Sequence, residues 1–543
     1  MQTGGIVKVK VLFRITALVL ALTTALMFAA CSKQDADSAS KSASKSTSKA
    51  STSGTASSED SAVEGSTATS SEATVSYETR VMSKGELTLK TIANIKSNLS
   101  HQGRRTVVRE GNYLYSCIND GGKSYLVRYD VTGATQPKEL QLFNRKDSSE
   151  PNFFFGWVAI KGDYIYCGAR NYEANVPNPD INNGKLVIVN KKDFKIATNA
   201  KVTFPNNKSS YQAEAGEEFV WENGKQDKTR LEQGYGTFDY KNGICNFNFK
   251  VSRVIVYKNI LIVNLQMRGW CAFAIDPKDP SKLTLASTTF WSNYEYGSYE
   301  HQGGQVFEAN GKTYYFAIGF AAGNACYDIT DIYNPKVVYD FVKGSKQIFT
   351  ERNKLYSMIQ EDFPNKSINA GVMGLQFFNV VVDYPNAYCT LSTGTRGQGT
   401  ENAFEAIITY DMTDIANGNI VVKDIAYLPE ENHVLYRDTD VPPTTLAKVG
   451  DYIFVGCLEQ GLGVFKIDNN GVARFNMMLT NEDMGINKNE CLGLDNIFTT
   501  GENEFVVLNC GGRKHTPGAA YDPIDEVSIT VPRILVVTVE PKK

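Results

Sequence analysis

Apolar and polar residues alternate in short runs along the chain, from about residue 105 to its C-terminus. The first run, residues 106–110, is followed by the turn Gly111-Asn112, by a second run at 113–117 and by a third run at 124–130 that ends in Asp. Alternation with a period of two, aromatic and β-branched residues within the runs, and Gly or Asn between them predict antiparallel strands joined as hairpins. We find no helical periodicity of comparable length within these repeats.

This unit occurs in seven copies. After the first copy, the turn and the strand behind it recur at 162–167, 258–263, 311–316, 386–389, 450–455 and 501–508, and the partner strand recurs at 185–190, 271–276, 325–328, 406–411, 463–468 and 533–539. A repeat of about 40–50 residues made of short strands is typical of a β-propeller. We therefore predict an all-β fold over residues 76–543, with seven four-stranded blades.

The two ends of this region indicate how the ring closes. The last copy ends at Val539 and lacks a fourth strand, whereas a spare strand at 86–95 precedes the first copy. Because a blade cannot bury its faces alone, neighbouring blades must stack and the ring must close. We predict that residues 86–95 complete blade seven; an ordinary edge strand is the alternative.

The turns after the partner strands carry a recognisable pattern. Residues 186–190 read Leu-Val-Ile-Val-Asn, and related Asp-containing turns occur at 129–137, 275–280, 327–335 and 410–415. This pattern resembles the LVIVD repeat, a family of bacterial and archaeal cell-surface β-propellers, although copies six and seven lack the Asp-x-x-x-Pro tail. The resemblance implies a surface propeller and brings no catalytic motif with it.

The N-terminus resembles a bacterial lipoprotein signal peptide over residues 1–30. Lys8, Lys10 and Arg14 precede an apolar run at 15–30, and Cys31 follows two alanines. We predict that Cys31 is acylated and anchors the protein in a lipid bilayer on the extracytoplasmic side, at the outer membrane or the cell surface. A plain transmembrane anchor is the alternative, but the apolar run is short for one.

Residues 31–75 read as a tether. The segment is rich in Ser, Thr, Ala and Lys, and contains no aromatic residue. Such a composition buries too little apolar surface to fold, so we predict a disordered, solvated segment. A glycosylated stalk is the alternative.

Charge and cysteine content narrow the choice of partner. The formal net charge is −3, and no basic run is interleaved with aromatic residues, which argues against a nucleic-acid partner. None of the ten cysteines forms a Cys-x-x-Cys pair. Five fall at matching strand ends: Cys117, Cys167, Cys389, Cys457 and Cys510. We expect buried apolar thiols there rather than disulfides, with a thiol site as the alternative.

The strand order predicts where a binding site lies. The turns between strands one and two and those between strands three and four share one face of the ring, called here the short-turn face. The opposite face, the long-loop face, receives the longer connections, at 168–184, 204–248, 343–376, 390–404 and 511–531. Elaborated loops at one end of a rigid scaffold are where binding residues usually lie.

Two of the four histidines occur in matching triplets, His101-Gln-Gly103 and His301-Gln-Gly303, just before the first strands of blades one and four. The candidate ligand-binding residues on the long-loop face are His101, Arg104, Arg170, Arg268, Trp270, Glu300, His301, Arg396, Glu401, Glu459 and Arg513. In this interpretation Arg and His donate hydrogen bonds and aromatic residues form an apolar floor. The alternative is that His-Gln-Gly is a blade-entry turn inherited with the repeat.

Binding is favoured over catalysis. The sequence has no Gly-x-Ser-x-Gly, no phosphate-binding Gly loop and no His-Glu-x-x-His, and the histidine spacing does not predict a metal site. Asp residues at 276–281 and 328–331 are expected to form Asx-turns rather than calcium loops. We predict no cofactor and, as partner, an envelope protein, a glycan or a small solute. The alternatives are a polysaccharide-active enzyme, with an acid pair drawn from Glu300, Glu401 and Glu459, and a structural subunit of an envelope assembly.

Overall fold

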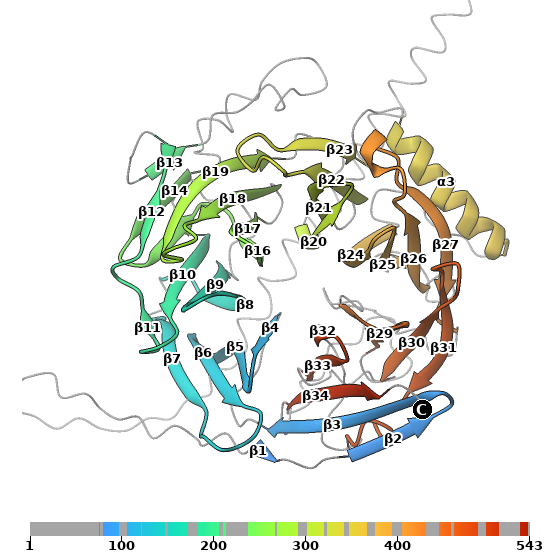
Figure 1. Ribbon diagram of the computed structural model, residues 1–543, viewed down its shortest axis with the longest axis horizontal. Coiled ribbons are helices and arrows are strands. Elements are labelled where there is room, and N and C mark those ends of the chain that lie inside the picture. Colours follow the sequence, from blue (N-terminus) through green and yellow to red (C-terminus); the bar gives the residue numbers. More distant parts are fainter. Residues whose placement is uncertain are drawn as a thin grey trace, which may run out of the picture. The chain divides into compact units, whose positions relative to one another are not determined.

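A computed structural model describes residues 75–76, 80–96, 106–120, 122–146, 150–171, 183–205, 210–212, 237–265, 269–290, 301–319, 323–340, 347–365, 375–393, 404–429, 445–457, 461–486, 496–509 and 533–540. All of them belong to one compact unit, Ser70–Lys543. Seven sheets, antiparallel except for the pair β12–β19, follow one another around a ring (Figure 1). The predicted all-β, seven-bladed propeller is confirmed. Within the described residues, no helix is both long and apolar enough to cross a membrane.

Four blades consist of four strands each. Blade one contains β4 (Val107–Glu110), β5 (Tyr113–Asp120), β6 (Lys123–Asp130) and β7 (Lys138–Asn144); blade four contains β20 (His301–Ala309), β21 (Lys312–Gly319), β22 (Gly323–Asp328) and β23 (Lys336–Asp340). Blade five contains β24 (Leu375–Asp383), β25 (Asn386–Thr393), β26 (Glu405–Asp411) and β27 (Val421–Tyr427); blade six contains β28 (Leu446–Val449), β29 (Tyr452–Gly456), β30 (Leu462–Ile467) and β31 (Ala473–Leu479).

The other three blades carry additional strands at their outer edges. Blade two contains β8 (Phe153–Lys161), β9 (Tyr164–Asn171), β10 (Gly184–Asn190), β15 (Ile244–Phe247), β14 (Thr237–Lys241) and β13 (Ser210–Gln212), and β11 (Lys195–Ile196) also pairs with β10. Blade three contains β16 (Val251–Tyr257), β17 (Ile260–Leu265), β18 (Gly269–Ile275) and β19 (Lys282–Phe290), with β12 (Lys201–Thr203) parallel to β19. Blade seven contains β32 (Asn496–Gly501), β33 (Glu504–Asn509), β34 (Arg533–Glu540) and β3 (Leu87–Lys96), and β1 (Val75–Ser76) and β2 (Arg80–Lys84) pair with β3.

The closing strand lies where the sequence predicts it. β3 runs antiparallel to β34, from the pair Thr88–Glu540 to the pair Lys96–Arg533, and so supplies the fourth strand of blade seven. A bulge at Ile92 shifts the register between the two halves of β3. Leu87 and Leu89 pack with residues of blade six, whereas Ala93 and Ile95 pack with residues of blade one. The closing strand is therefore held by both neighbouring blades.

Turn chemistry explains the hairpins between strands one and two. Gly111, Gly162 and Gly450 have φ values of 58°, 56° and 54° at the first turn position. Two-residue hairpins need this left-handed conformation, which glycine adopts at little cost. Lys258 occupies the same turn position in blade three with φ 50°.

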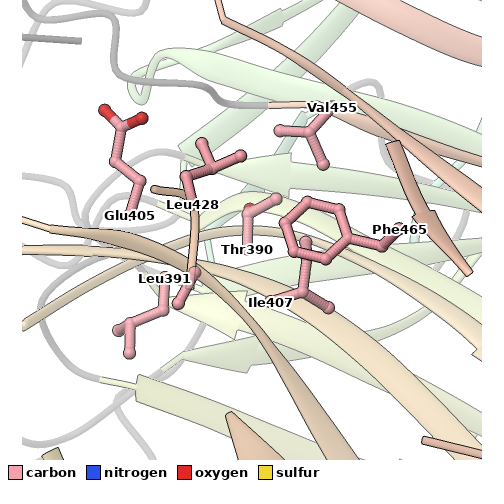
Figure 2. A pocket seen from close by; sticks show the side chains of 8 residues that line it. Thr390, Leu391, Glu405, Ile407, Leu428, Val455 and Phe465 are labelled. Atoms are coloured by element: carbon pink, nitrogen blue, oxygen red, sulfur yellow. The ribbon is translucent and has the colours of Figure 1, made fainter. Parts of the chain in front are cut away.

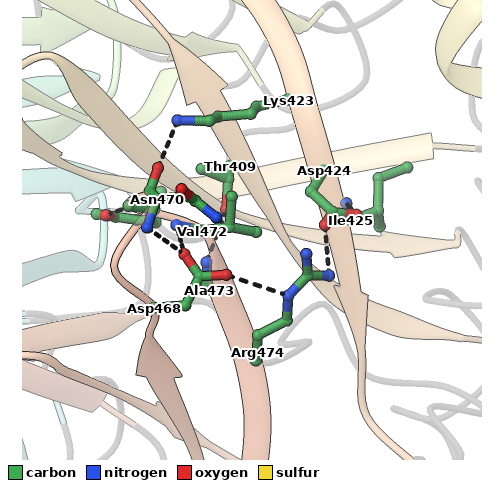
Figure 3. Close-up of polar contacts among 11 residues, drawn as sticks. Thr409, Lys423, Asp424, Ile425, Asp468, Asn470, Val472, Ala473 and Arg474 are labelled. Atoms are coloured by element: carbon green, nitrogen blue, oxygen red, sulfur yellow. Dashed lines mark hydrogen bonds and ion pairs between the residues drawn. The ribbon is translucent and has the colours of Figure 1, made fainter.

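Aspartates shape the turns between strands three and four. Asp468 Oδ1 accepts hydrogen bonds from the backbone N–H groups of Asn470 and Val472, at 2.8 and 2.9 Å (Figure 3). Asp130 Oδ1 accepts the Thr132 N–H at 2.9 Å, and its Oδ2 accepts the Thr135 N–H at 3.1 Å. The N–H of Thr330 likewise bonds Asp328, so the Asx-turn prediction is confirmed at this turn.

Polar contacts also join blades five and six at this face. Lys423 donates to the carbonyl oxygen of Asn470 at 2.6 Å, and the N–H of Ala473 donates to Thr409 Oγ1 at 3.2 Å. Arg474 pairs with Asp424 of the neighbouring blade, as Figure 3 shows. These contacts fix one blade against the next.

Two of the predicted long loops contain regular structure. The segment 204–248 holds β13, β14 and β15, which extend blade two at its outer edge, because the turn at Asn242-Gly243 folds β14 back on β15. The segment 343–376 holds helix α3 (Gln347–Asp362), which lies along the outside of the ring near β27 (Figure 1). Leu355 and Ile359 of this helix are buried against blades four and five. Both segments were wrongly assigned as loops only.

The predicted signal peptide, Cys31 and nearly all of the predicted tether lie outside the described residues. Val75, the last residue of the predicted tether, already pairs with Ile95 in β1. The seven cysteines that the structure describes are buried and form no disulfide with one another: Cys117, Cys167, Cys245, Cys271, Cys326, Cys389 and Cys457. Burial raises the pKa of the Cys167 and Cys389 thiols, as predicted for apolar packing positions.

Candidate functional site

The innermost strand of each blade starts at the long-loop face and runs towards the short-turn face. In four consecutive blades this strand carries a bulge in its first half, which shifts its register against the second strand. The bulges lie between Phe155 and Trp157, between Val251 and Arg253, between His301 and Gly303, and between Phe377 and Val380. The register of β4 in blade one and of β28 in blade six is regular, and the shift in β32 of blade seven lies near its other end.

A bulge bends a strand and redirects its side chains, and bulges are frequent beside binding and active sites. Blades two to five therefore present a modified inner edge at the long-loop face. In the described parts of β4, β28 and β32, no bulge lies in the first half of the strand.

Polar side chains of one blade satisfy the bulged backbone of the next. The N–H of Thr106 donates to the Gly156 carbonyl at 2.9 Å, and Thr106 Oγ1 accepts the Val158 N–H at 2.8 Å. Asn264 Nδ2 donates to the Gly303 carbonyl at 3.2 Å across the junction of blades three and four. These bonds compensate for the hydrogen bonds that the bulges remove from the sheet.

The second His-Gln-Gly triplet lies within a strand rather than before it. His301 is the first residue of β20 and Gln302 occupies the bulge. A Cβ on Gly303 would lie 2.9 Å from Asn379 Oδ1 in blade five, and a Cβ on Gly304 would lie 2.7 Å from the Tyr315 hydroxyl. Close packing thus explains why glycine occupies both positions, which supports the structural interpretation of Gly303. The first triplet, including His101, lies outside the described residues.

Arg170 stands at the end of β9, on the long-loop face of blade two. Its guanidinium carbon lies 5.7 Å from the ring centroid of Trp157 and 5.9 Å from that of Phe154. Arginine over aromatic rings gains a cation–π attraction. Arg170 is half-buried, so the structure keeps it accessible.

A second cation lies on the other side of the same blade. Lys185 Nζ stands 4.4 Å from the centroid of the Phe153 ring and donates to Asn246 Oδ1 at 2.8 Å. Burial lowers the pKa of the Lys185 ammonium, while the nearby Asp239 carboxylate acts in the opposite direction. Blade two thus holds two cations against aromatic side chains, one near the end of β9 and one near the start of β10.

A third cation, Arg253, follows the bulge in β16 of blade three and was not among the sequence candidates. Burial lowers the pKa of its guanidinium, and the nearby Tyr315 partly offsets this effect. Val254 packs on blade two, whereas Ile255 and Tyr257 pack on the cluster shared with blade four. Since Arg253 alternates with Val254, it faces blade four.

Trp270 is fully buried at this junction. Its ring makes edge contacts with Tyr315 and Tyr327, at centroid distances of 5.4 and 5.2 Å. No described residue accepts a hydrogen bond from its indole N–H. With no surface left for a ligand, Trp270 packs the two blades together and does not form the exposed apolar floor that was predicted.

The remaining sequence candidates lie wholly or largely outside the described residues. His301 is described only as the first residue of β20. Outside the described residues lie His101, Arg104, Arg268, Glu300, Arg396, Glu401, Glu459 and Arg513. The acid pair required for glycoside chemistry is therefore untested.

A small cavity between blades five and six is lined by Thr390, Leu391, Glu405, Ala406, Ile407, Leu428, Val455 and Phe465 (Figure 2). Its volume is about 10 Å³, which is the space of one water molecule. It is therefore too small to hold an organic ligand. Among the described residues, no group of three or more His, Cys, Asp or Glu side chains has the spacing of a metal site.

Most of the ion pairs between described residues lie at the short-turn face of the ring. At the short-turn face, basic side chains are paired with carboxylates, as in Arg109–Glu504, Lys312–Asp328 at 2.8 Å and Lys448–Asp383 at 2.9 Å. The one ion pair between described residues that departs from this pattern is Lys84–Asp483, at the outer edge of blade seven. Lys185 and Arg253 on the long-loop face form no ion pair with a described carboxylate.

The blades and their closure define the protein as a seven-bladed β-propeller. Its structure is similar to the Nup133 β-propeller domain of Vanderwaltozyma polyspora (9% identity, 85% of this chain and 100% of that chain, TM-score 0.46) and to a europium-containing methanol dehydrogenase (11% identity, 86% and 92%, TM-score 0.43). These similarities carry no inference about activity. No family model and no curated protein matches the chain.

Proposed function

We propose that this protein is a lipid-anchored, extracytoplasmic β-propeller that binds an envelope protein, a glycan or a small solute at its long-loop face. The observation that carries the binding site is the set of inner-strand bulges that the described residues show in blades two to five. They modify one sector of one face, where Arg170 and Lys185 are held against aromatic rings. A rigid ring with a locally altered edge is a suitable scaffold for recognition.

The anchor is proposed from the sequence alone. Acylation of Cys31 and the Ser/Thr-rich segment behind it would hold the propeller away from the membrane. Replacement of Cys31 by Ser in the producing cell should move the protein from the membrane fraction to the soluble extracytoplasmic fraction. Retention of the Cys31→Ser protein in membranes would contradict the anchor while leaving the binding site untouched.

Binding is tested by a thermal-shift screen of the purified full chain with sugars, cell-wall fragments, nucleotides and divalent metals. A ligand at about 100 times its dissociation constant stabilises the folded state by roughly 2.7 kcal/mol. We expect the shift to be lost in Arg170→Gln and in the double variant His101→Ala, His301→Ala. Arg474→Gln, which removes a positive charge at the short-turn face, is the matched control.

Two results would refute this site. A ligand shift that survives both long-loop variants and disappears in Arg474→Gln would move the site to the other face. A flat screen followed by a pull-down from envelope extract that captures nothing would remove the binding proposal altogether.

A further inference from the structure

Arg253 differs in position from Arg109 and Lys448, two other basic residues on innermost strands. Arg109 and Lys448 lie near the short-turn ends of their strands and pair with Glu504 and Asp383. Arg253 lies near the long-loop end of β16, directly behind the bulge, where it is half-buried. Within the described part of the chain, the guanidinium makes no hydrogen bond and no ion pair; its one electrostatic neighbour is the Tyr315 side chain.

A cation removed from water without a counter-ion is costly, and proteins usually pair such a group or use it. Burial lowers the pKa of the Arg253 guanidinium, which is the expected consequence of that cost. Because an arginine keeps its proton in a protein, an anion is the partner that would offset this cost most directly. A planar fork of N–H donors fits a carboxylate or phosphate through two parallel hydrogen bonds.

The surroundings of Arg253 are fixed rather than adaptable. The Tyr315 hydroxyl donates to Asn264 Oδ1 at 2.7 Å, and Asn264 Nδ2 donates to the Gly303 carbonyl at 3.2 Å. Tyr315 and Asn264 are fully buried, and Gly304 leaves room for the Tyr315 ring. Because Asn264 already accepts the Tyr315 proton, the phenol presents its oxygen, not its hydrogen, to further neighbours. This network spans blades three and four and holds the wall beside Arg253 in one arrangement.

We propose that Arg253 anchors an oxyanion, a carboxylate or phosphate group, on the ligand of the long-loop face. The inference rests on the proposed function and makes it specific: the ligand carries a negative charge that reaches the junction of blades three and four. Arg170 and Lys185 in blade two add positive charge on the same face. Neutral sugars and cationic ligands are not expected to bind at this position.

The test is isothermal titration calorimetry on the full chain with two probes. Sodium glucuronate is compared with glucose, which lacks the carboxylate, and inorganic phosphate is compared with chloride at equal ionic strength. We expect one oxyanion to bind and its neutral or chloride counterpart not to bind. Binding of glucuronate alone assigns a carboxylate, and binding of phosphate alone assigns a phosphate; either supports the proposal.

Variants then assign the oxyanion to Arg253. Arg253→Gln should raise the dissociation constant of the oxyanion at least tenfold. Arg253→Lys, which keeps the charge but loses the planar set of guanidinium donors, should raise it by a smaller factor. Arg474→Gln, with the same loss of charge at the short-turn face, should leave the constant unchanged. If Arg253→Gln does not fold, the Lys variant decides alone.

The proposal is overturned if neither glucuronate nor phosphate binds at concentrations below those at which chloride itself gives a signal. It is also overturned if the Arg253→Gln variant binds the oxyanion with the same dissociation constant as the wild type. Failure of the proposed binding function at the long-loop face can be distinguished from failure of the Arg253 proposal. An envelope fragment that binds the wild type and Arg253→Gln equally would refute the role of Arg253 and leave binding at the long-loop face supported. Oxyanion binding that depends on Arg253, with no envelope ligand found, would support the role of Arg253 and count against the proposed envelope ligand.

Discussion

Replacement of Leu89 by Ala tests whether the N-terminal strand closes the ring. Leu89 is 2% exposed, pairs with Val539 across the β3–β34 ladder and packs in the cluster shared by blades six and seven. Truncating a buried leucine to alanine costs about 2–5 kcal/mol, because the cavity is refilled only in part. We expect about 3 kcal/mol for Leu89→Ala, since several large neighbours, among them Phe454 and Phe505, hold the site open.

The size of the protein decides the assay. For roughly 470 residues the entropy of unfolding is about 1 kcal/mol/K, so a loss of 3 kcal/mol lowers the melting temperature by only about 3 °C. Hydrogen exchange is more sensitive, because each 1.4 kcal/mol is a factor of ten in an equilibrium constant. Opening of the closing strand should therefore become roughly 100-fold more frequent, and amides of 88–96 and of their partners on β34 should exchange faster by that factor.

Val81 provides the matched control. It lies on β2, which pairs with β3, but its side chain is 61% exposed. Val81→Ala should change stability by less than about 0.5 kcal/mol. If Leu89→Ala and Val81→Ala accelerate exchange equally, or if neither does, the packing of β3 does not hold the ring closed and the reasoning fails.

Three further predictions concern single side chains. Burial alone would raise the pKa of Asp130, but hydrogen bonds from Thr132 and Thr135 outweigh it and hold this pKa below its ordinary value. Asp130→Asn should therefore lower stability by about 1–2 kcal/mol at neutral pH. The difference should be present above the unfolded-state pKa of about 3.9 and disappear as the pH falls below it; urea titrations at several pH values that show a constant difference down to pH of about 2 would count against it. Gly304→Ala should cost about 1–3 kcal/mol, because φ is 148° and the new Cβ would meet the Tyr315 hydroxyl and the Phe316 carbonyl at 2.7 Å. Gly111→Ala meets no atom within 4 Å and should cost less, so an equal loss of denaturant midpoint in both would contradict the packing argument. The seven described cysteines should not react with a thiol reagent at mildly alkaline pH until the protein is unfolded in denaturant, because burial raises the pKa of thiols such as Cys245 and Cys326; full labelling of the folded protein would refute this.

The candidate site shows how far residue types alone can lead. Arg170 was found because an arginine beside a long loop is a reasonable binding residue, and the structure gives it aromatic neighbours. Arg253 was missed, because it lies inside an apolar run that reads as an ordinary strand. A charged residue on the innermost strand of a blade was the available signal, but its position next to Tyr315 depends on the neighbouring blade.

The seven blades, the hairpin turns and the closing strand could all be predicted from the sequence alone. The strands follow from the alternation of apolar and polar residues, and the hairpin turns follow from Gly and Asn at fixed positions. The closing strand follows from a count of the strands, because blade seven lacks one. The closing strand at 86–95 could be inferred because a ring of stacked sheets leaves one place for a spare strand.

The contacts between side chains of neighbouring blades could not be predicted in this way, because they depend on the tertiary structure. A one-residue bulge moves every following side chain to the other face of the sheet, so Val251 and Val254 both face blade two while Arg253 between them faces blade four. No local sequence pattern predicts such a bulge, because the neighbouring blade supplies the hydrogen bonds that stabilise it. The N–H of Thr106, for example, donates to the carbonyl oxygen of Gly156. Burial of Trp270 and docking of α3 depend in the same way on residues far apart in the sequence.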